Sequence, residues 1–260
     1  MKFAICSVCG LRPPIYVKRS SGMAYCTLCL RNAVERSIKK TIRRLELLSP
    51  TDRIIALVRP CVEDICFLSL FLEIESEFRM VKVKPLLAVP SSPDYDLLYS
   101  TANSICKAHK IELHRVKIPS SRSCLSCTSN AMNMALKIAK RANYNKIVMP
   151  VTLDEYCSLA LAYPVISQRD MRPLRGLLLS ALPQSSNRHL ALPAIEVLSA
   201  ELIAAVQIPE TPQACSMKSS SWIGKLRRLL LDLEGQRAGS LMGLLRTLQK
   251  IGSLLFTEAI

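Results

Sequence analysis

The stretch Arg53-Ile54-Ile55-Ala56-Leu57-Val58 is the part of the sequence that decides the fold. It follows the helix-breaking pair Ser49-Pro50 and is apolar from Ile54 onward. A short, continuous apolar run of this kind is typical of a parallel strand that is buried on both faces. We therefore expect it to form a buried strand of an α/β domain.

Helix-like and strand-like segments alternate after this run. The predicted helices are Cys66–Phe78, Tyr95–His109 and Ala131–Asn143, and the predicted strands are Lys82–Val89, Ile111–Ile118 and Lys146–Val151. Such alternation predicts an open, mostly parallel sheet with helices on both faces. Ligands of these sheets bind beyond the carboxyl ends of the strands, so we expect the chemistry in the loops that follow them.

The overall composition restricts the class of protein. With 260 residues, 50% of them hydrophobic, the chain can bury a core, which excludes intrinsic disorder. The first residues do not resemble a signal peptide, and no apolar tract approaches the roughly 20 residues of a membrane span. We expect a cytoplasmic protein without a membrane segment. In a reducing compartment its eleven cysteines indicate metal ligation or burial rather than disulfides.

Four cysteines near the N-terminus have the spacing of a zinc site. Cys6-x2-Cys9 and Cys26-x2-Cys29 are separated by sixteen residues that fit a short hairpin. Four thiolates make a closed tetrahedral zinc site, which is structural because no position is left open for a reactant. We expect one zinc ion to stabilise residues 1–30 as a small module.

A strongly basic helix is predicted directly after this module. Residues Arg31–Leu48 place apolar side chains on one stripe and basic ones elsewhere, and the chain as a whole carries a formal charge of +15. Such a face attracts polyanions by counterion release, so RNA is the expected partner, although a merely solvated face has the same pattern. The expected contacts are Arg36, Lys39, Lys40, Arg43 and Arg44, with a second basic patch at Lys225, Arg227 and Arg228 beside Trp222, which either stacks on a base or is buried.

A further Cys-x-x-Cys pair, Cys124 and Cys127, follows the predicted strand that ends at Ile118. Three interpretations remain open on the residues alone. The pair could be a redox dithiol, half of a second zinc site, or part of an iron–sulfur ligand set completed by a cysteine from elsewhere.

The order of these motifs resembles the PP-loop tRNA 2-thiolation enzymes of the TtuA type. The shared features are the zinc knuckle, the basic helix, the α/β sheet, Cys-x-x-Cys before a helix, Leu153-Asp154-Glu155 after a strand, and a lone Cys215. The resemblance covers most of the chain as spaced motifs. It implies a 4Fe-4S cluster on Cys124, Cys127 and Cys215 with one iron open to sulfur, a catalytic Asp154 near the substrate, and tRNA as partner.

The chain departs from that family at the nucleotide site. Where the family binds ATP with Ser-Gly-Gly-x-Asp-Ser, this sequence has Val58-Arg59-Pro60-Cys61-Val62-Glu63-Asp64, which contains no glycine and adds negative charge. Glycines let backbone N–H groups approach phosphates, so ATP binding is doubtful. No cysteine follows Cys215, whereas the family usually carries a C-terminal zinc ribbon.

We therefore expect a tRNA-binding protein of the 2-thiouridine synthetase type whose ATP-dependent adenylation is impaired or lost. The alternative is a non-catalytic, zinc-containing scaffold that binds RNA or a paralogue. Further expected partners are a sulfur-carrier protein and a second subunit, either identical or an active paralogue. The predicted organisation is a zinc module (1–30), a basic linking helix (31–50), a PP-loop-like α/β domain (51–185) and a helical C-terminal region of the same domain (186–260).

Overall fold

The core of the protein is a parallel sheet in the order β5-β4-β3-β6-β7. The computed structural model describes residues 4–78, 80–90, 95–120, 123–162, 175–181, 189–208 and 221–257. The five strands are β3 (Arg53–Val58), β4 (Lys82–Pro90), β5 (His114–Ile118), β6 (Lys146–Val148) and β7 (Leu190–Ala191). The predicted α/β class and parallel sheet are confirmed.

Strand β3 lies at the centre of this sheet, with β4 on one side and β6 on the other. Every residue from Ile54 to Val58 is buried. This explains the unbroken apolar run: both faces of the strand are covered, so no position faces water.

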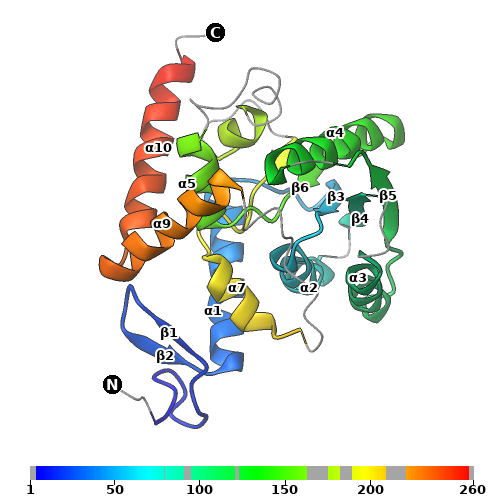
Figure 1. Cartoon of the computed structure of the whole chain (residues 1–260). Helices are drawn as coiled ribbons and strands as arrows, with labels where there is room; N and C mark the ends of the chain where they lie inside the picture. Colours follow the sequence, from blue (N-terminus) through cyan, green and yellow to red (C-terminus); the bar gives the residue numbers. More distant parts are fainter. Residues whose placement is uncertain are drawn as a thin grey trace.

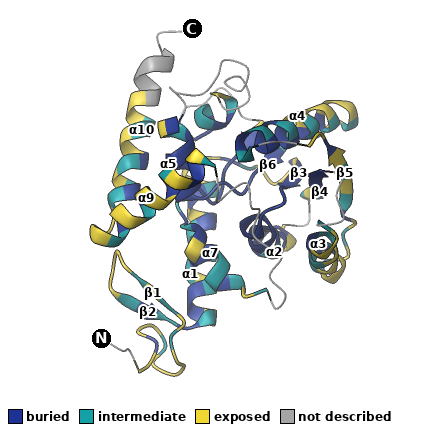
Figure 2. Ribbon diagram, in the orientation of Figure 1, coloured by how far each residue is buried: buried dark blue, intermediate teal, exposed yellow. Residues whose placement is uncertain are grey.

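Helices cover the two faces of the sheet (Figure 1). One hydrophobic cluster joins the sheet to α1 (Thr27–Arg44), α2 (Val62–Ser76), α3 (Asp96–Ala108) and α7 (Ser199–Val206). A second joins it to α4 (Cys124–Ala142), α5 (Leu153–Ala162), α9 (Trp222–Gln236) and α10 (Ser240–Thr257). Figure 2 shows that the buried residues concentrate in the sheet and in the helix sides turned toward it. None of the helices in the described parts of the chain is both long and apolar enough to cross a membrane.

Helix α1 and the C-terminal region both pack against the sheet. Helix α1 buries Leu30, Val34 and Ile38 in the core. The C-terminal region supplies the edge strand β7 as well as helices. The N-terminal residues form a hairpin of β1 (Tyr16–Lys18) and β2 (Met23–Tyr25), whose turn contains Gly22 at φ +66°.

Two helices begin earlier in the chain than predicted. Helix α4 begins at Cys124 rather than near Ala131, because the Ser123 hydroxyl accepts the N–H of Ser126 and caps the helix. Helix α1 begins at Thr27, with Cys26 as its extended N-cap residue. The Cys-x-x-Cys pair predicted before a helix therefore lies in the first turn of that helix.

Candidate functional site

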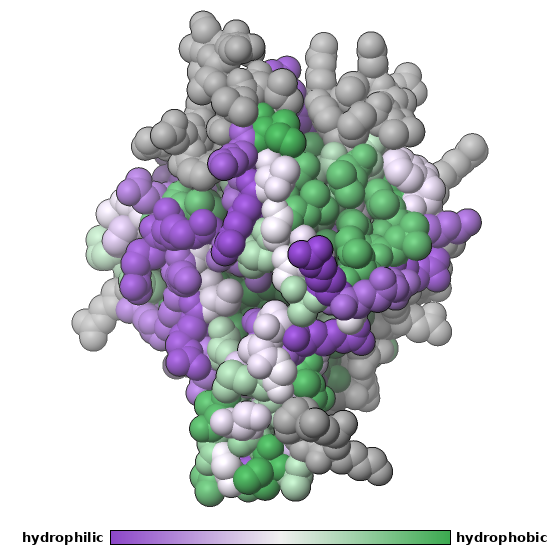
Figure 3. All heavy atoms as spheres, turned by 90° about the vertical axis from the view of Figure 1, so that its left-hand side faces the viewer, coloured by the Kyte–Doolittle hydropathy of each residue, from purple (hydrophilic) through white to green (hydrophobic). Residues whose placement is uncertain are grey.

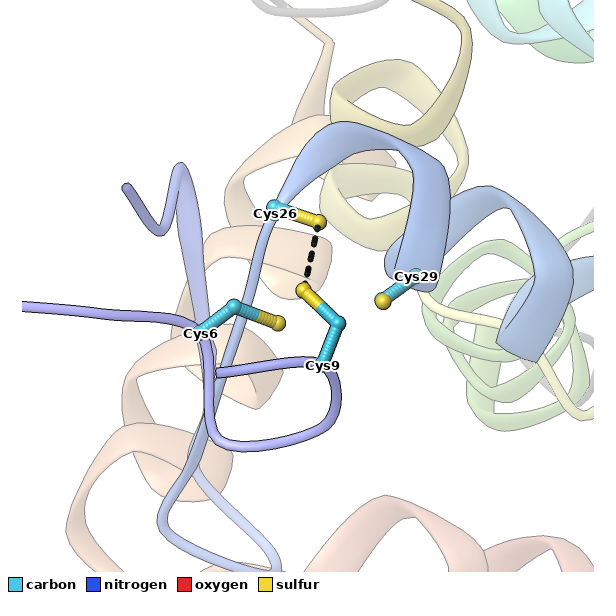
Figure 4. A group of neighbouring side chains, drawn as sticks. All are labelled: Cys6, Cys9, Cys26 and Cys29. Atoms are coloured by element: carbon cyan, nitrogen blue, oxygen red, sulfur yellow. Dashed lines mark hydrogen bonds between the residues drawn. The ribbon is translucent and has the colours of Figure 1, made fainter. Parts of the chain in front are cut away.

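The four N-terminal cysteines come together as a candidate metal centre. Their sulfur atoms lie within 4.8 Å of one another, and Cys9 Sγ is 3.9 Å from Cys26 Sγ. Figure 4 shows the four sulfurs facing a common centre. Four thiolates bound tetrahedrally to one zinc ion at about 2.3 Å stand about 3.8 Å apart. The group therefore has the dimensions of a single-ion site.

Local structure positions these thiols and affects their ionisation. Cys6 and Cys9 lie on a turn closed by the bond from Gly10 N–H to Cys6 O, while Cys26 and Cys29 lie at the start of α1. Burial opposes the ionisation of Cys6, but backbone N–H groups outweigh it and lower the pKa to about 6. Burial raises the pKa of Cys29 to about 12. Because a metal takes thiolates, binding there would release protons.

The carboxyl edge of the sheet contains a buried ion-pair cluster built on Arg59, directly after β3. Its guanidinium binds both oxygens of Asp64 (2.9 Å each) and both oxygens of Glu155 (2.6 and 3.1 Å). The Arg59 backbone N–H also donates to Asp64 Oδ2 (2.7 Å). Burial acts to lower the pKa of Arg59, but the two carboxylates raise it well above its ordinary value, so the side chain stays charged.

A second arginine extends this cluster from the C-terminal region. Arg227, on α9, donates to Glu63 Oε1 (3.1 Å) and to Asp154 Oδ2. Asp154 is fully buried, and its oxygens also accept the backbone N–H (2.9 Å) and the hydroxyl (2.8 Å) of Ser199. The prediction that Arg227 contributes to a surface basic patch is wrong, because its side chain points inward to these carboxylates. The catalytic role of Asp154 stays a prediction.

These contacts change the interpretation of the β3–α2 loop. Asp64 pairs with Arg59 and Glu63 pairs with Arg227, so the loop carboxylates take part in internal ion pairs. The adjacent cavity, lined among others by Thr128, Glu155 and Arg227, has a volume of only about 20 Å³. Pockets for drug-sized ligands usually have about 300–1,000 Å³. The described residues thus fill this edge of the sheet with their own side chains.

The second Cys-x-x-Cys pair lies beside this cluster. Cys124 lines the small cavity together with Thr128 and Arg227, and Cys127 is buried. Residues three apart in a helix face the same side, so the two thiols lie on one side of α4. Cys215, the expected third ligand, lies outside the described residues. Two of the three expected ligands are thus placed at the carboxyl edge of the sheet, the position expected for chemistry in an open α/β fold.

The structure divides the predicted RNA-binding residues into two groups. Lys39 pairs with Glu35 and Glu77 (2.8 Å each), and Arg44 pairs with Glu196 (2.7 Å). Three residues of α1 are exposed with no ion pair among the described residues: Arg36, Lys40 and Arg43. Their spacing puts them on one face of the helix, and we call them the α1 basic stripe.

The second basic patch is reduced to Lys225 and Arg228, which are exposed on α9. Trp222, at the start of the same helix, is 49% exposed, so its burial in the core is excluded. Leu229 and Leu233 of this helix are exposed as well. Figure 3 shows this side of the molecule, where hydrophilic and hydrophobic side chains both reach the surface.

The sequence missed the role of Arg59. The sequence did contain a signal for a buried ion pair: Arg59 directly follows the apolar strand, and Glu63 and Asp64 come shortly after it. A charge in such a place needs partners, and one of them, Asp64, is only five residues away. Its other partner, Glu155, is 96 residues away and had no local signal.

Comparisons with known proteins identify a shared fold. No family model matches the sequence, and no curated protein matches it either. Among solved structures, the chain is similar to the U34-tRNA thiolase NcsA from Methanococcus maripaludis with its [4Fe-4S] cluster. The TM-score is 0.76 over 97% of this chain and 88% of that chain, with 16% sequence identity. The likeness at this identity is one of fold.

Proposed function

We propose that this chain binds tRNA and takes part in the 2-thiolation of a uridine, without carrying out ATP-dependent adenylation itself. The observation that carries the proposal is the position of Cys124 and Cys127. They lie in the first turn of α4, at the carboxyl edge of the sheet, in a fold similar to that of a U34-tRNA thiolase with a [4Fe-4S] cluster.

Cys124, Cys127 and Cys215 are the residues that would hold such a cluster. A 4Fe-4S cluster on three thiolates supplies an iron with an open position for sulfur. Helix α4 presents two of the thiols from one turn, and Arg227 lies beside Cys124 at the same cavity. In this proposal Asp154 lies near the substrate and holds Arg227 in position beside it.

The N-terminal thiols are proposed to bind zinc rather than a cluster. Their sulfurs are spaced for one tetrahedral ion, whereas a four-iron cluster needs its ligand sulfurs farther apart because each binds a different iron. The ion would fix the hairpin to the start of α1. The α1 basic stripe, with Lys225 and Arg228, would then contact tRNA phosphates.

The loss of ATP chemistry is supported by the Arg59 cluster. Phosphate loops offer free backbone N–H groups at a helix N-terminus. Here the Arg59 N–H is bound to Asp64, Pro60 has no N–H, and the Cys61 N–H binds Arg59 O at 2.7 Å. An anion of several charges would also have to lie beside the four carboxylates that bind Arg59 and Arg227.

The same cluster favours a second candidate function, a zinc-containing scaffold. Such a protein would bind tRNA or an active paralogue in the cytoplasm without reacting. A sulfur-carrier protein and an identical or paralogous second subunit are proposed partners of the thiolation function.

Metal analysis of protein purified without oxygen separates these functions. The thiolation proposal expects about one zinc and four irons per chain, with the iron lost in Cys124→Ser and the zinc lost in Cys26→Ser. Zinc without iron would support the scaffold. In both cases we expect no tRNA-dependent release of pyrophosphate from ATP, and robust release would contradict the assignment of the Arg59 cluster.

A further inference from the structure

A pocket unrelated to the proposed thiolation site opens at the opposite, amino edge of the sheet. Its volume is about 460 Å³, within the usual range for small-molecule sites. It lies between the last turns of α1 and α2 and the segments that lead from them into β3 and β4. Its apolar walls include Ile42, Leu48, Ile74, Phe78 and Val81.

One carboxylate in this pocket has no partner. The side chain of Glu75 lines the pocket and the residue is only 8% exposed, yet its carboxylate has no hydrogen bond or ion pair with any described residue. The neighbouring Asp52 differs, since its oxygens accept the Ser49 N–H and the Asn145 amide at 2.7 Å each. Burying a carboxylate without a donor is costly, so a ligand that supplies a donor would recover this free energy.

The charges around Glu75 favour a cation as that ligand. Helices α1 and α2 both end at the pocket, and helix C-termini carry partial negative charge. Lys39, at the rim, is already bound to Glu35 and Glu77. Arg43 also lines the pocket, but its side chain is exposed and makes no ion pair with Glu75. A divalent metal ion fits less well, because it needs several oxygen ligands and the walls are apolar.

We propose that this pocket binds a small organic ammonium compound, whose ammonium group pairs with Glu75 and whose apolar part lies against Phe78, Ile42 and Leu48. Phe78 is 47% exposed, so its ring is available to an incoming ligand. An ammonium group is a strong donor to a carboxylate, and the apolar walls exclude water from the pair.

Calorimetric titration of the full chain with phenethylamine and with its neutral analogue 2-phenylethanol tests the proposal. The titration is done at about pH 8, because burial raises the pKa of Glu75 to about 7 and the carboxylate must be ionised. We expect the amine to bind at least about tenfold more tightly than the alcohol. Equal affinities, or no saturable binding of the amine at millimolar concentrations, would overturn the proposal.

Two variants locate the site. Glu75→Gln keeps the shape and should lower the amine affinity by about tenfold or more while leaving the alcohol unchanged. Phe78→Ala should weaken both ligands, because it removes the apolar contact. Glu112→Gln, which removes an exposed carboxylate beside His114, is the matched control and should bind like the unchanged protein. Amine binding that survives Glu75→Gln would place the ligand elsewhere.

Discussion

The N-terminal module and the carboxyl edge of the sheet both bring together side chains that are costly to bury without partners. The two regions differ in where those partners come from. In the module, four thiols face a common centre with the spacing of a single-ion site, so the group that would complete it is a metal ion from outside the chain. At the sheet edge, four carboxylates surround two arginines that the chain provides itself. A site that completes itself has little room for a ligand, whereas one that lacks a component must acquire it.

The largest expected effect comes from removing two thiols from the module. Cys26→Ser with Cys29→Ser should abolish zinc binding, because two ligands cannot hold the ion against competition. Zinc per chain, measured by elemental analysis, should fall from about one to near zero, and thermal unfolding should start at a lower temperature. Cys106→Ala, which changes a buried cysteine of α3 far from the group, should keep its zinc. Unchanged zinc in the double variant would refute the site.

The next effect comes from removing the arginine of the sheet edge. Arg59→Met leaves Asp64 and Glu155 buried without their partner, which should reduce the free energy of unfolding by about 3–5 kcal/mol in urea titrations. Arg36→Met, an exposed change of the same kind on α1, should cost less than about 0.5 kcal/mol. If the triple change Arg59→Met, Asp64→Asn and Glu155→Gln were no more stable than Arg59→Met alone, the ion pairs would not explain the loss.

A smaller effect, on tRNA affinity, is expected from changes to the α1 basic stripe. Changing Arg36, Lys40 and Arg43 together to Gln should weaken tRNA binding and reduce the slope of log affinity against log salt by about 2–3. The matched control changes Lys39 and Arg44 to Gln. These two residues already pair with carboxylates, so the slope of log affinity against log salt should change by less. Equal slopes for the two variants, measured by filter binding, would remove the α1 basic stripe from the interface.

The smallest effect, on the free energy of unfolding, is expected at Glu75, a buried carboxylate that forms no ion pair with an arginine among the described residues. Burial raises its folded-state pKa to about 7, above the value in the unfolded chain, so the native state loses stability as pH rises through this interval. Glu75→Gln should therefore stabilise the protein at about pH 8 by about 1–2 kcal/mol, since solvent screens part of the charge. The gain should vanish below about pH 4, where both states hold the proton. A stabilisation independent of pH would show that charge is not its cause.

Features with a local signal could be predicted from the sequence. The apolar run from Ile54 to Val58 specified a buried strand, and the spacing of Cys6, Cys9, Cys26 and Cys29 specified a four-thiol group. The sulfurs meet because each pair is fixed by its own turn. Helix ends were less predictable: the role of Ser123 as a cap became apparent only from its contact with Ser126.

Features that depend on distant residues could not be predicted. Arg227 has basic neighbours in sequence and looked like a surface residue, but its partners Glu63 and Asp154 are 164 and 73 residues away. The pocket around Glu75 likewise forms only when α1 and α2 end side by side. Charge patterns identify cations, but only tertiary structure decides which of them reach water.

The packing of α1 on α7 has a consequence for synthesis of the chain. Helix α1 is made before the Ser199–Val206 segment that covers it, and Thr41 and Arg44 of α1 are bound to Glu196, which precedes that segment. On the ribosome, the apolar side of α1 must therefore wait until most of the chain has emerged. Long-range closure of this kind slows folding and leaves nascent chains open to aggregation. An early-bound metal ion would hold the first turn of this helix through that interval.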